Sequence, residues 1–184
     1  MKPFIVCSLL GLLSVGGVTS AAAQSPAVVL VQSSGLWRVE PHTDRISGEQ
    51  KMQAKLITLR ATQQSRKRSM TAGILISCAA GKPYVAILFM GLVSSRATTD
   101  LAYRIDSHPG KILRATADSD RRGVYLTNQQ HVAEFLRQLG PSSRLFVRID
   151  LPRIGLSEAE FNTAGAASAI NAALAKCRPG QRKT

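Results

Sequence analysis

Apolar residues along the chain gather in short runs and in alternations with polar residues, a pattern typical of β-strands. The longest runs are 72–79 and 83–90, and they predict a β-hairpin whose turn is formed by residues 81–83. Cys78 has the same parity as Ile76 within the first run. Its side chain is therefore expected to point to the core side of the hairpin.

Shorter alternating stretches predict further strands at 36–40, 52–60, 101–106, 111–117, 123–126 and 144–150. Pro41 is expected to end the first of these strands. The polar stretch 61–69 has no apolar periodicity and is interpreted as a loop. The β-branched run at 27–31 is open to two interpretations, a further strand or a tail.

Two segments have helical periodicity. Residues 127–139 predict a helix with a capping box formed by Thr127 and Gln130 and with one apolar face, Val132, Phe135, Leu136 and Leu139. A second helix is expected to begin near Asn162 or Thr163, either of which can serve as its N-cap, and to end at Arg178. Its apolar stripe comprises Ala166, Ile170, Ala173, Leu174 and Cys177.

The order of these elements is mostly strands, followed by a helix, a strand and a terminal helix. That order predicts an α+β fold with a mainly antiparallel, sandwich-like β core. The short helix and the C-terminal helix are expected to pack on this core, and one disulfide is expected to pin the C-terminal helix. We expect a single domain at 36–180, preceded by an N-terminal segment at 24–35 and followed by a tail at 181–184.

Residues 1–23 have the features of a secretory signal peptide. Lys2 supplies a positive start, residues 4–18 are mostly apolar, and residues 21–23 are alanines that suit a cleavage site. The apolar run is shorter than the ~20 residues that a spanning helix needs, so an uncleaved anchor is the less favoured alternative. Cleavage after Ala23 leaves 161 of the 184 residues, with no transmembrane segment expected among them.

Composition adds a strong positive charge to this picture. The chain has 24 Lys and Arg residues against 11 Asp and Glu residues, a formal net charge of +13. A basic exported protein is expected to associate with anionic envelope components. Because export would separate the protein from nucleic acid, and because aromatic residues are only 5% of the chain, we expect no nucleic-acid partner.

Of the three cysteines, Cys7 lies in the signal peptide, which leaves Cys78 and Cys177. In an oxidising compartment such a pair normally forms a disulfide, and only one connectivity exists. Two free thiols are the alternative, although no C-x-x-C motif supports a redox pair.

The sequence has none of the short motifs that would indicate catalysis or cofactor binding. The three histidines are far apart in sequence and have no second ligand at metal-binding spacing, so no metal site is expected. Neither a G-x-S-x-G elbow nor a phosphate-binding glycine motif is present, and we expect no cofactor. Asp106 and Asp150 are candidate catalytic carboxylates by position only.

Basic residues are the remaining candidates for contact with a ligand or partner. Arg66, Lys67 and Arg68 lie together in the predicted loop, whereas Arg104 and Arg148 lie on predicted strands. Strands would hold the two arginines rigidly enough to bind a carboxylate in bidentate geometry. Alternatively, the two arginines could form structural ion pairs with Asp106 and Asp150.

Several blocks of sequence resemble a family of exported proteins associated with type VI secretion, the VasI or TagO family. The matching blocks are Trp37, Thr43 with Asp44, 74–78, 84–87, 103–106, 145–148, 161–165 and Cys177. The resemblance implies a periplasmic location and an accessory role without established catalytic residues. Residues 66–68 belong to none of the blocks.

The function expected from the sequence is that of a non-catalytic periplasmic accessory protein of the cell envelope, with a link to type VI secretion. It would act by contact with an envelope or secretion-system protein or with peptidoglycan. The alternatives are an envelope hydrolase whose site is assembled only in three dimensions, and an exported enzyme inhibitor.

Overall fold

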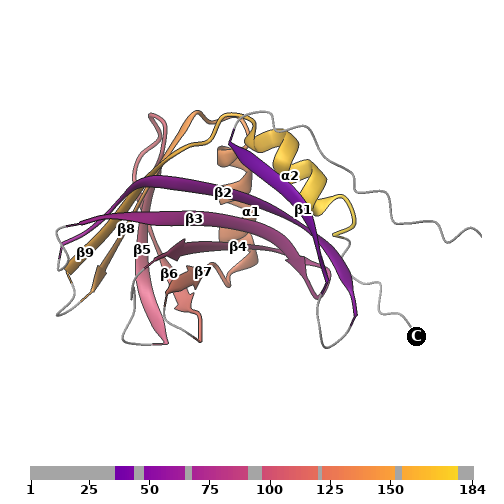
Figure 1. The fold of residues 1–184 in the computed structure, drawn as a ribbon, viewed down its shortest axis with the longest axis horizontal. Helices are drawn as coiled ribbons and strands as arrows, with labels where there is room; N and C mark the ends of the chain where they lie inside the picture. The colour runs from indigo at the N-terminus through magenta and orange to yellow at the C-terminus, as the bar shows by residue number, and fades with distance from the viewer. Residues whose placement is uncertain are drawn as a thin grey trace, which may run out of the picture.

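The computed structural model describes residues 36–43, 48–64, 68–90, 97–119, 122–151 and 155–177. These residues form nine strands and two helices (Figure 1). The strands are β1 (Trp37–Thr43), β2 (Gln50–Gln63), β3 (Arg68–Ala79), β4 (Lys82–Phe89), β5 (Thr98–Ile105), β6 (Lys111–Ala117), β7 (Gly123–Tyr125), β8 (Arg144–Leu151) and β9 (Gly155–Asn162). The helices are α1 (Gln129–Leu139) and α2 (Ala166–Leu174).

Eight of the strands form a closed antiparallel barrel, to which β1 is added as an extra strand on β2. The order around the barrel is β2, β3, β4, β7, β6, β5, β8 and β9, and β9 pairs with β2 to close it. The prediction of a sandwich-like α+β core is therefore wrong. The nine strands form one continuous sheet that curls onto itself, so there are no two stacked sheets.

Closure of the barrel depends on β2, which has two neighbours on the same side at different points along its length. Its register with β1 ends at the pair Trp37–Leu56, and its register with β9 begins at the pair Ala61–Ala159. Between these points its register with β3 shifts, between Thr58 and Ala61. Such a bulge bends a strand and increases its twist, which turns the second half of β2 toward β9.

Strand β9 was not among the predicted elements. Its inward positions Ser157 and Ala159 are polar or small, so the apolar half of the alternation is weak until Phe161. The signal that could have identified it is the outward alternation of Glu158 and Glu160 between these buried positions.

The predicted loop at 61–69 is also wrong for the part that the structure describes. Strand β2 continues to Gln63, and β3 begins at Arg68. The Gln63 side chain is buried, and its Nε2 donates a hydrogen bond of 3.0 Å to Ser157 Oγ on β9. A polar residue can lie inside the barrel here because a polar partner faces it.

The predicted hairpin at the centre of the sequence is confirmed as strands β3 and β4. Its turn is shorter than predicted, because Lys82 pairs with Ala79 and belongs to β4. The two turn residues, Ala80 and Gly81, have φ angles of 50° and 73°. Two consecutive positive φ angles are characteristic of the type I′ turn, whose twist matches that of the flanking strands.

Strand β1 extends through Pro41 to Thr43, so the prediction that Pro41 ends the strand is wrong. Pro41 pairs in register with Met52 of β2. Proline is tolerated there because β1 pairs with β2 alone among the described strands, and its other edge needs no N–H donor.

The predicted apolar face of helix α1 is confirmed, since all four of its residues are buried. The N-cap is Asn128, whose Oδ1 accepts hydrogen bonds from the backbone N–H groups of Gln130 and His131 at 2.9 and 3.2 Å. The predicted capping box of Thr127 and Gln130 is therefore wrong, and the N-cap lies one residue later than Thr127. Asn is as effective an N-cap as Ser or Asp.

Helix α2 begins later than predicted. Its N-cap is Gly165, which has a φ of 87° and offers no capping side chain, so Asn162 and Thr163 are not the N-cap. Asn162 instead ends β9, and its Oδ1 accepts a hydrogen bond from the N–H group of Ala164. The predicted stripe of α2 is buried at Ala166, Ile170 and Ala173.

The two helices complete the core. Helix α1 lies against β4, and the Phe135 ring meets the Tyr103 ring edge-on with centroids 5.1 Å apart. Helix α2 lies over β1, β2 and β3 (Figure 1). The indole Nε1 of Trp37 donates a hydrogen bond to the carbonyl oxygen of Thr163, which ties β1 to the segment that leads into α2.

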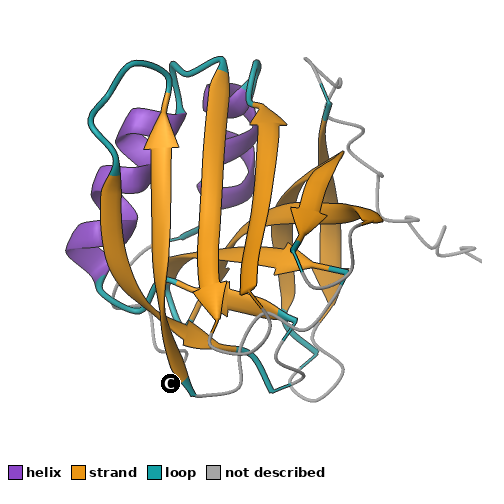
Figure 2. Ribbon diagram, turned by 90° about the vertical axis from the view of Figure 1, so that its left-hand side faces the viewer, coloured by secondary structure: helices purple, strands orange, loops and turns teal. Residues whose placement is uncertain are grey.

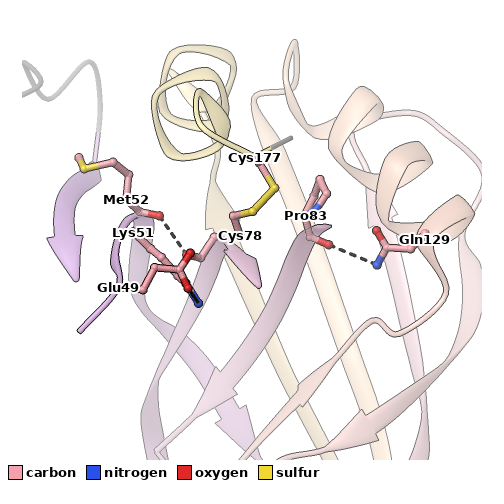
Figure 3. The surroundings of a disulfide bond; sticks show 8 residues. Glu49, Lys51, Met52, Cys78, Pro83, Gln129 and Cys177 are labelled. Carbon is pink, nitrogen blue, oxygen red and sulfur yellow. Dashed lines mark hydrogen bonds and ion pairs between the residues drawn. A yellow bond between two sulfur atoms is a disulfide. The ribbon is translucent and has the colours of Figure 1, made fainter. Parts of the chain in front are cut away.

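The predicted disulfide between Cys78 and Cys177 is present (Figure 3). The two residues are 99 apart in sequence, and their Cα atoms lie 5.5 Å apart. Cys177 follows the end of α2, so the bond fastens the end of this helix to the end of β3. The prediction that a disulfide pins the C-terminal helix to the β core is thus confirmed.

We expect loss of the disulfide to lower the free energy of unfolding by up to about 4.7 kcal/mol, because the closed loop spans roughly 100 residues. Urea unfolding of the wild type and of the Cys78→Ser/Cys177→Ser double variant would measure the difference. A reductant should destabilise the wild type and leave the double variant unchanged. A loss below about 0.5 kcal/mol would show that the bond contributes little.

A second prediction concerns Tyr103, whose side chain is 3% exposed. Its hydroxyl is the one buried side-chain polar atom among the described residues that lacks a hydrogen-bond partner. Burial, assisted by the nearby charge of Glu134, raises the pKa of Tyr103. Tyr103→Phe should therefore increase the free energy of unfolding by about 1 kcal/mol, since the ring contact with Phe135 is kept.

The matched control for this substitution is Phe135→Leu, which removes the ring contact from the other side and should destabilise the fold by about 1 kcal/mol or more. Thermal unfolding of the three proteins would compare them. Destabilisation by Tyr103→Phe would mean that the hydroxyl has a partner in solution.

Candidate functional site

The predicted arginines lie on the outer face of the barrel formed by β6, β5, β8 and β9. Figure 2 looks onto the side of the barrel that carries β9, β8 and β5 in Figure 1. Alternation along β8 turns Leu145, Val147 and Ile149 into the core, and it turns Arg144, Phe146 and Arg148 outward. The outward positions of Arg104 and Arg148 are thus as the alternation predicts.

The register of the strands brings these outward side chains together. Arg104 on β5 lies opposite Phe146 on β8, and Arg148 lies opposite Ala102. On the other side of β5, Ala102 lies opposite Ile112 of β6. Directly opposed side chains in an antiparallel pair are neighbours, so the two arginines flank the same aromatic ring.

A hollow of about 380 Å³ lies at this place on the outer face. Its lining includes Ala102, whose methyl group is short, and Gly110, which has no side chain. The longer side chains of Ile112, Phe146 and Arg148 form its walls. The hollow therefore combines an apolar base with guanidinium groups at its rim.

Neither arginine has an acidic partner in the part of the chain that the structure describes. The ion pairs expected as the structural alternative, Arg104 with Asp106 and Arg148 with Asp150, are not formed there. Arg114, on the same outer face, does form such a pair, with its Nη1 3.0 Å from Asp100 Oδ1. Arg104 and Arg148 therefore differ from Arg114 in forming no ion pair with a described residue, although Glu158 of β9 lies directly opposite Arg148.

Asp106 has a structural role at the end of β5. It has a φ of 45°, in the left-handed region that Asp tolerates better than most residues. Its carboxylate accepts hydrogen bonds from the backbone N–H of Arg144 at 2.8 Å and from both the N–H and the hydroxyl of Ser143. These bonds fix the start of β8, and hence the position of Phe146, relative to β5.

The basic cluster at residues 66–68 is placed only in part. Arg66 and Lys67 lie outside the described residues. Arg68 is described only by its backbone, as the first residue of β3. Their contribution to a contact surface therefore stays a prediction.

The sequence did not single out Phe146, Arg144 or Ile112 as site residues. The available signal was their position in the alternation. Phe146 and Ile112 occupy outward positions that a half-buried strand normally gives to polar residues, and Ile112 is 70% exposed. An outward aromatic residue between two arginines on one strand marks a candidate contact surface.

Among the described residues, no group of three or more His, Cys, Asp or Glu side chains comes together as a metal site. Neither of the described helices is long and apolar enough to cross a membrane.

Comparisons of the chain with models of protein families, with curated proteins and with solved structures give no match. The resemblance to the VasI or TagO family therefore stays a prediction from the quoted blocks of sequence.

The contacts of Asp106 lead to a prediction about acid stability. Partial burial tends to raise the pKa of Asp106, but the hydrogen bonds from Arg144 and Ser143 outweigh it and lower the pKa below its ordinary value. Because the folded-state pKa is depressed, the carboxylate stabilises the fold above the ordinary Asp range, and this stabilisation is lost as the pH falls through the folded-state pKa.

Asp106→Asn should therefore destabilise the protein near neutral pH, by less than about 1 kcal/mol for so exposed a group. The difference from the wild type should shrink as the pH is lowered below about 4, in the Asp range. Urea unfolding at several pH values would measure it. Asp150→Asn is the control, since Asp150 is exposed and has no hydrogen bond or ion pair to a described residue. If the difference in free energy of unfolding between Asp106→Asn and the wild type did not depend on pH, the stabilising role given to the Asp106 carboxylate would be contradicted.

Proposed function

We propose that the protein is a non-catalytic accessory protein of the periplasm that acts by contact with an envelope protein or with the cell wall. The contact surface is the outer face of β5, β6 and β8. One observation carries the proposal: Arg104 and Arg148 flank Phe146 on barrel strands, and neither has an acidic partner among the described residues.

The geometry suits a carboxylate ligand for physical reasons. A guanidinium group binds a carboxylate through two parallel hydrogen bonds, and an exposed aromatic ring packs on the apolar part of the same ligand. Strands of a closed barrel fix the backbone positions from which both arginines project, so binding needs no rearrangement of the backbone. The net charge, +13 for the full chain and +12 once Lys2 is removed with the signal peptide, would attract anionic partners over a longer range.

The periplasmic location is supported by the signal-peptide pattern and by the Cys78–Cys177 disulfide, since disulfides persist mainly in oxidising compartments. The link to type VI secretion is supported only by the family resemblance.

The test uses the purified mature protein, residues 24–184, and the variant Arg104→Gln/Arg148→Gln. We expect the wild type to co-sediment with purified peptidoglycan, or to form a cross-link to an envelope protein in cells through a photo-reactive residue placed at Ile112. The double variant should lose either contact. Arg114→Gln is the matched control, because it removes a charge from the same face that is already paired with Asp100.

The proposal fails if neither peptidoglycan nor an envelope protein contacts this face. It also fails if the contact survives in Arg104→Gln/Arg148→Gln, because the charges that define the surface would then be irrelevant. Cell fractionation tests the location separately, and recovery of the protein in the cytoplasm would contradict it.

A further inference from the structure

The outer face of the hairpin formed by β3 and β4 carries no charged side chain. Along β4, Val85, Ile87 and Phe89 point into the core, and the positions between them point outward. We call the outward positions of β3, β4 and their neighbour β7 the hairpin face: Thr71, Gly73, Leu75, Ser77, Tyr84, Ala86, Leu88, Met90, Gly123 and Tyr125. The absence of charge is notable in a chain with 24 basic and 11 acidic residues.

The hairpin face is apolar where a solvated sheet is normally polar. Antiparallel sheets that face water on one side usually place polar residues at the outward positions. Leu88 and Met90 are nevertheless 37% and 67% exposed, and Ile57 of β2 lies in the same row of the sheet as Gly73 and Leu88. A contiguous exposed surface of this kind marks an interaction site.

The register of the hairpin pairs one large residue with one small residue at each outward position. The pairs are Met90 with Thr71, Leu88 with Gly73, Leu75 with Ala86, and Tyr84 with Ser77. Gly73 leaves a gap between Ile57 and Leu88. A Cβ atom at Gly73 would meet the backbone oxygen of Leu56 at 3.5 Å, and no described side chain comes within 4 Å of that point.

A surface with this pattern is complementary to a second copy of itself. A twofold axis that runs along the strands, between β3 and β4, would place β3 of one copy over β4 of the other. Each large side chain would then lie over the small residue of the equivalent pair, so that Leu88 of one copy faces Gly73 of the other. Sheets in such contact pack about 10 Å apart, and their side chains interdigitate.

The distribution of charge also favours a second copy as the occupant. Two copies carry the same positive net charge, +13 for the full chain, so they repel each other where their basic surfaces meet. An uncharged face is where two such molecules can approach. An acidic protein or an anionic membrane would instead be matched by basic residues on the face, and the hairpin face has none.

Charged residues do border the hairpin face, and they have both signs. They are Lys55 and Arg60 on β2, Lys82 at the hairpin turn, and Asp118 and Arg122 beside Gly123. Lys55 is already paired with Glu40 of β1. The border therefore frames the uncharged surface without giving it the character of an anion-binding site.

The size of the surface sets the expected strength of the contact. With β2, it spans four strands at a spacing of about 4.8 Å and about six residues along each strand, a footprint of roughly 400 Å². Stable interfaces of standard size bury about 800 Å² on each partner. We therefore expect a weak dimer, with a dissociation constant in the micromolar range.

We propose that the hairpin face binds a second copy of this chain, and that the two copies form a twofold-symmetric dimer in which β3 of each packs on β4 of the other. The contact uses different strands from the surface on β5, β6 and β8. It is therefore tested independently of the proposed function.

Sedimentation-velocity ultracentrifugation of the purified mature protein, between low and high micromolar concentrations, measures the association. We expect a concentration-dependent conversion of monomer to dimer. Leu88→Arg and Met90→Arg should each weaken the association at least about tenfold, because each places an unpaired charge in the interface. Ile112→Arg is the matched control, since Ile112 is an exposed aliphatic residue outside the hairpin face, and it should change the dissociation constant less than about twofold.

Gly73→Val separates shape from hydrophobicity. The substitution adds apolar surface, so non-specific association through exposed apolar groups would become stronger. It also fills the gap that receives Leu88 of the other copy, so the proposed dimer should weaken at least about tenfold. The Cβ atom fits at Gly73 and valine is favoured in strands, so thermal unfolding of the monomer should show no loss of stability.

The inference is overturned if the wild type stays monomeric throughout this concentration range. It is also overturned if Gly73→Val strengthens the association, or if Met90→Arg leaves it unchanged. Thermal unfolding checks that each variant is folded. If Leu88→Arg does not fold, Met90→Arg carries the same test at a more exposed position. Loss of the dimer in Met90→Arg and Gly73→Val and its retention in Ile112→Arg support the inference.

Discussion

Barrel closure depends on the second half of β2, which turns away from β1 at the bulge between Thr58 and Ala61 and pairs with β9. The pairing brings a polar residue from each strand into the interior, where Gln63 donates a hydrogen bond to Ser157. A buried amide without such a partner would be costly, so this bond favours the register that closes the barrel. Closure leaves the barrel without free edges at β9 and at the second half of β2.

The geometry of the outer face follows from this closure. Once β9, β8, β5 and β6 are neighbours in fixed register, the side chains at alternate positions of each strand must project from the same face. Asp106 reinforces the arrangement by holding the start of β8 against the end of β5. Arg104, Phe146 and Arg148 are therefore placed by backbone pairing, which fixes the positions of their Cα atoms before any partner arrives.

The opposite region of the molecule is stabilised by different means. Helix α2 lies over β1, β2 and β3, and a cluster of small buried residues, Ala166, Ala169 and Ala173, allows the close approach. The disulfide then fastens the end of α2 to β3, and Trp37 fastens β1 to the segment before α2. The covalent and helical ties involve β1, β2 and β3, not the strands β5 and β8 that carry Arg104 and Arg148.

Local patterns in the sequence determined the hairpin at Cys78, the apolar face of α1, the outward positions of Arg104 and Arg148 and the single possible cysteine pair. Each of these depends on the periodicity or the chemistry of nearby residues. The closed barrel could not be predicted in the same way, because β9 has small and polar inward residues and because a bulge in β2 changes the partner of that strand. Only the tertiary structure decided that Phe146 and Ile112 join the two arginines around Ala102. The register between strands that are far apart in sequence places these side chains beside one another, and no local sequence pattern encodes that register.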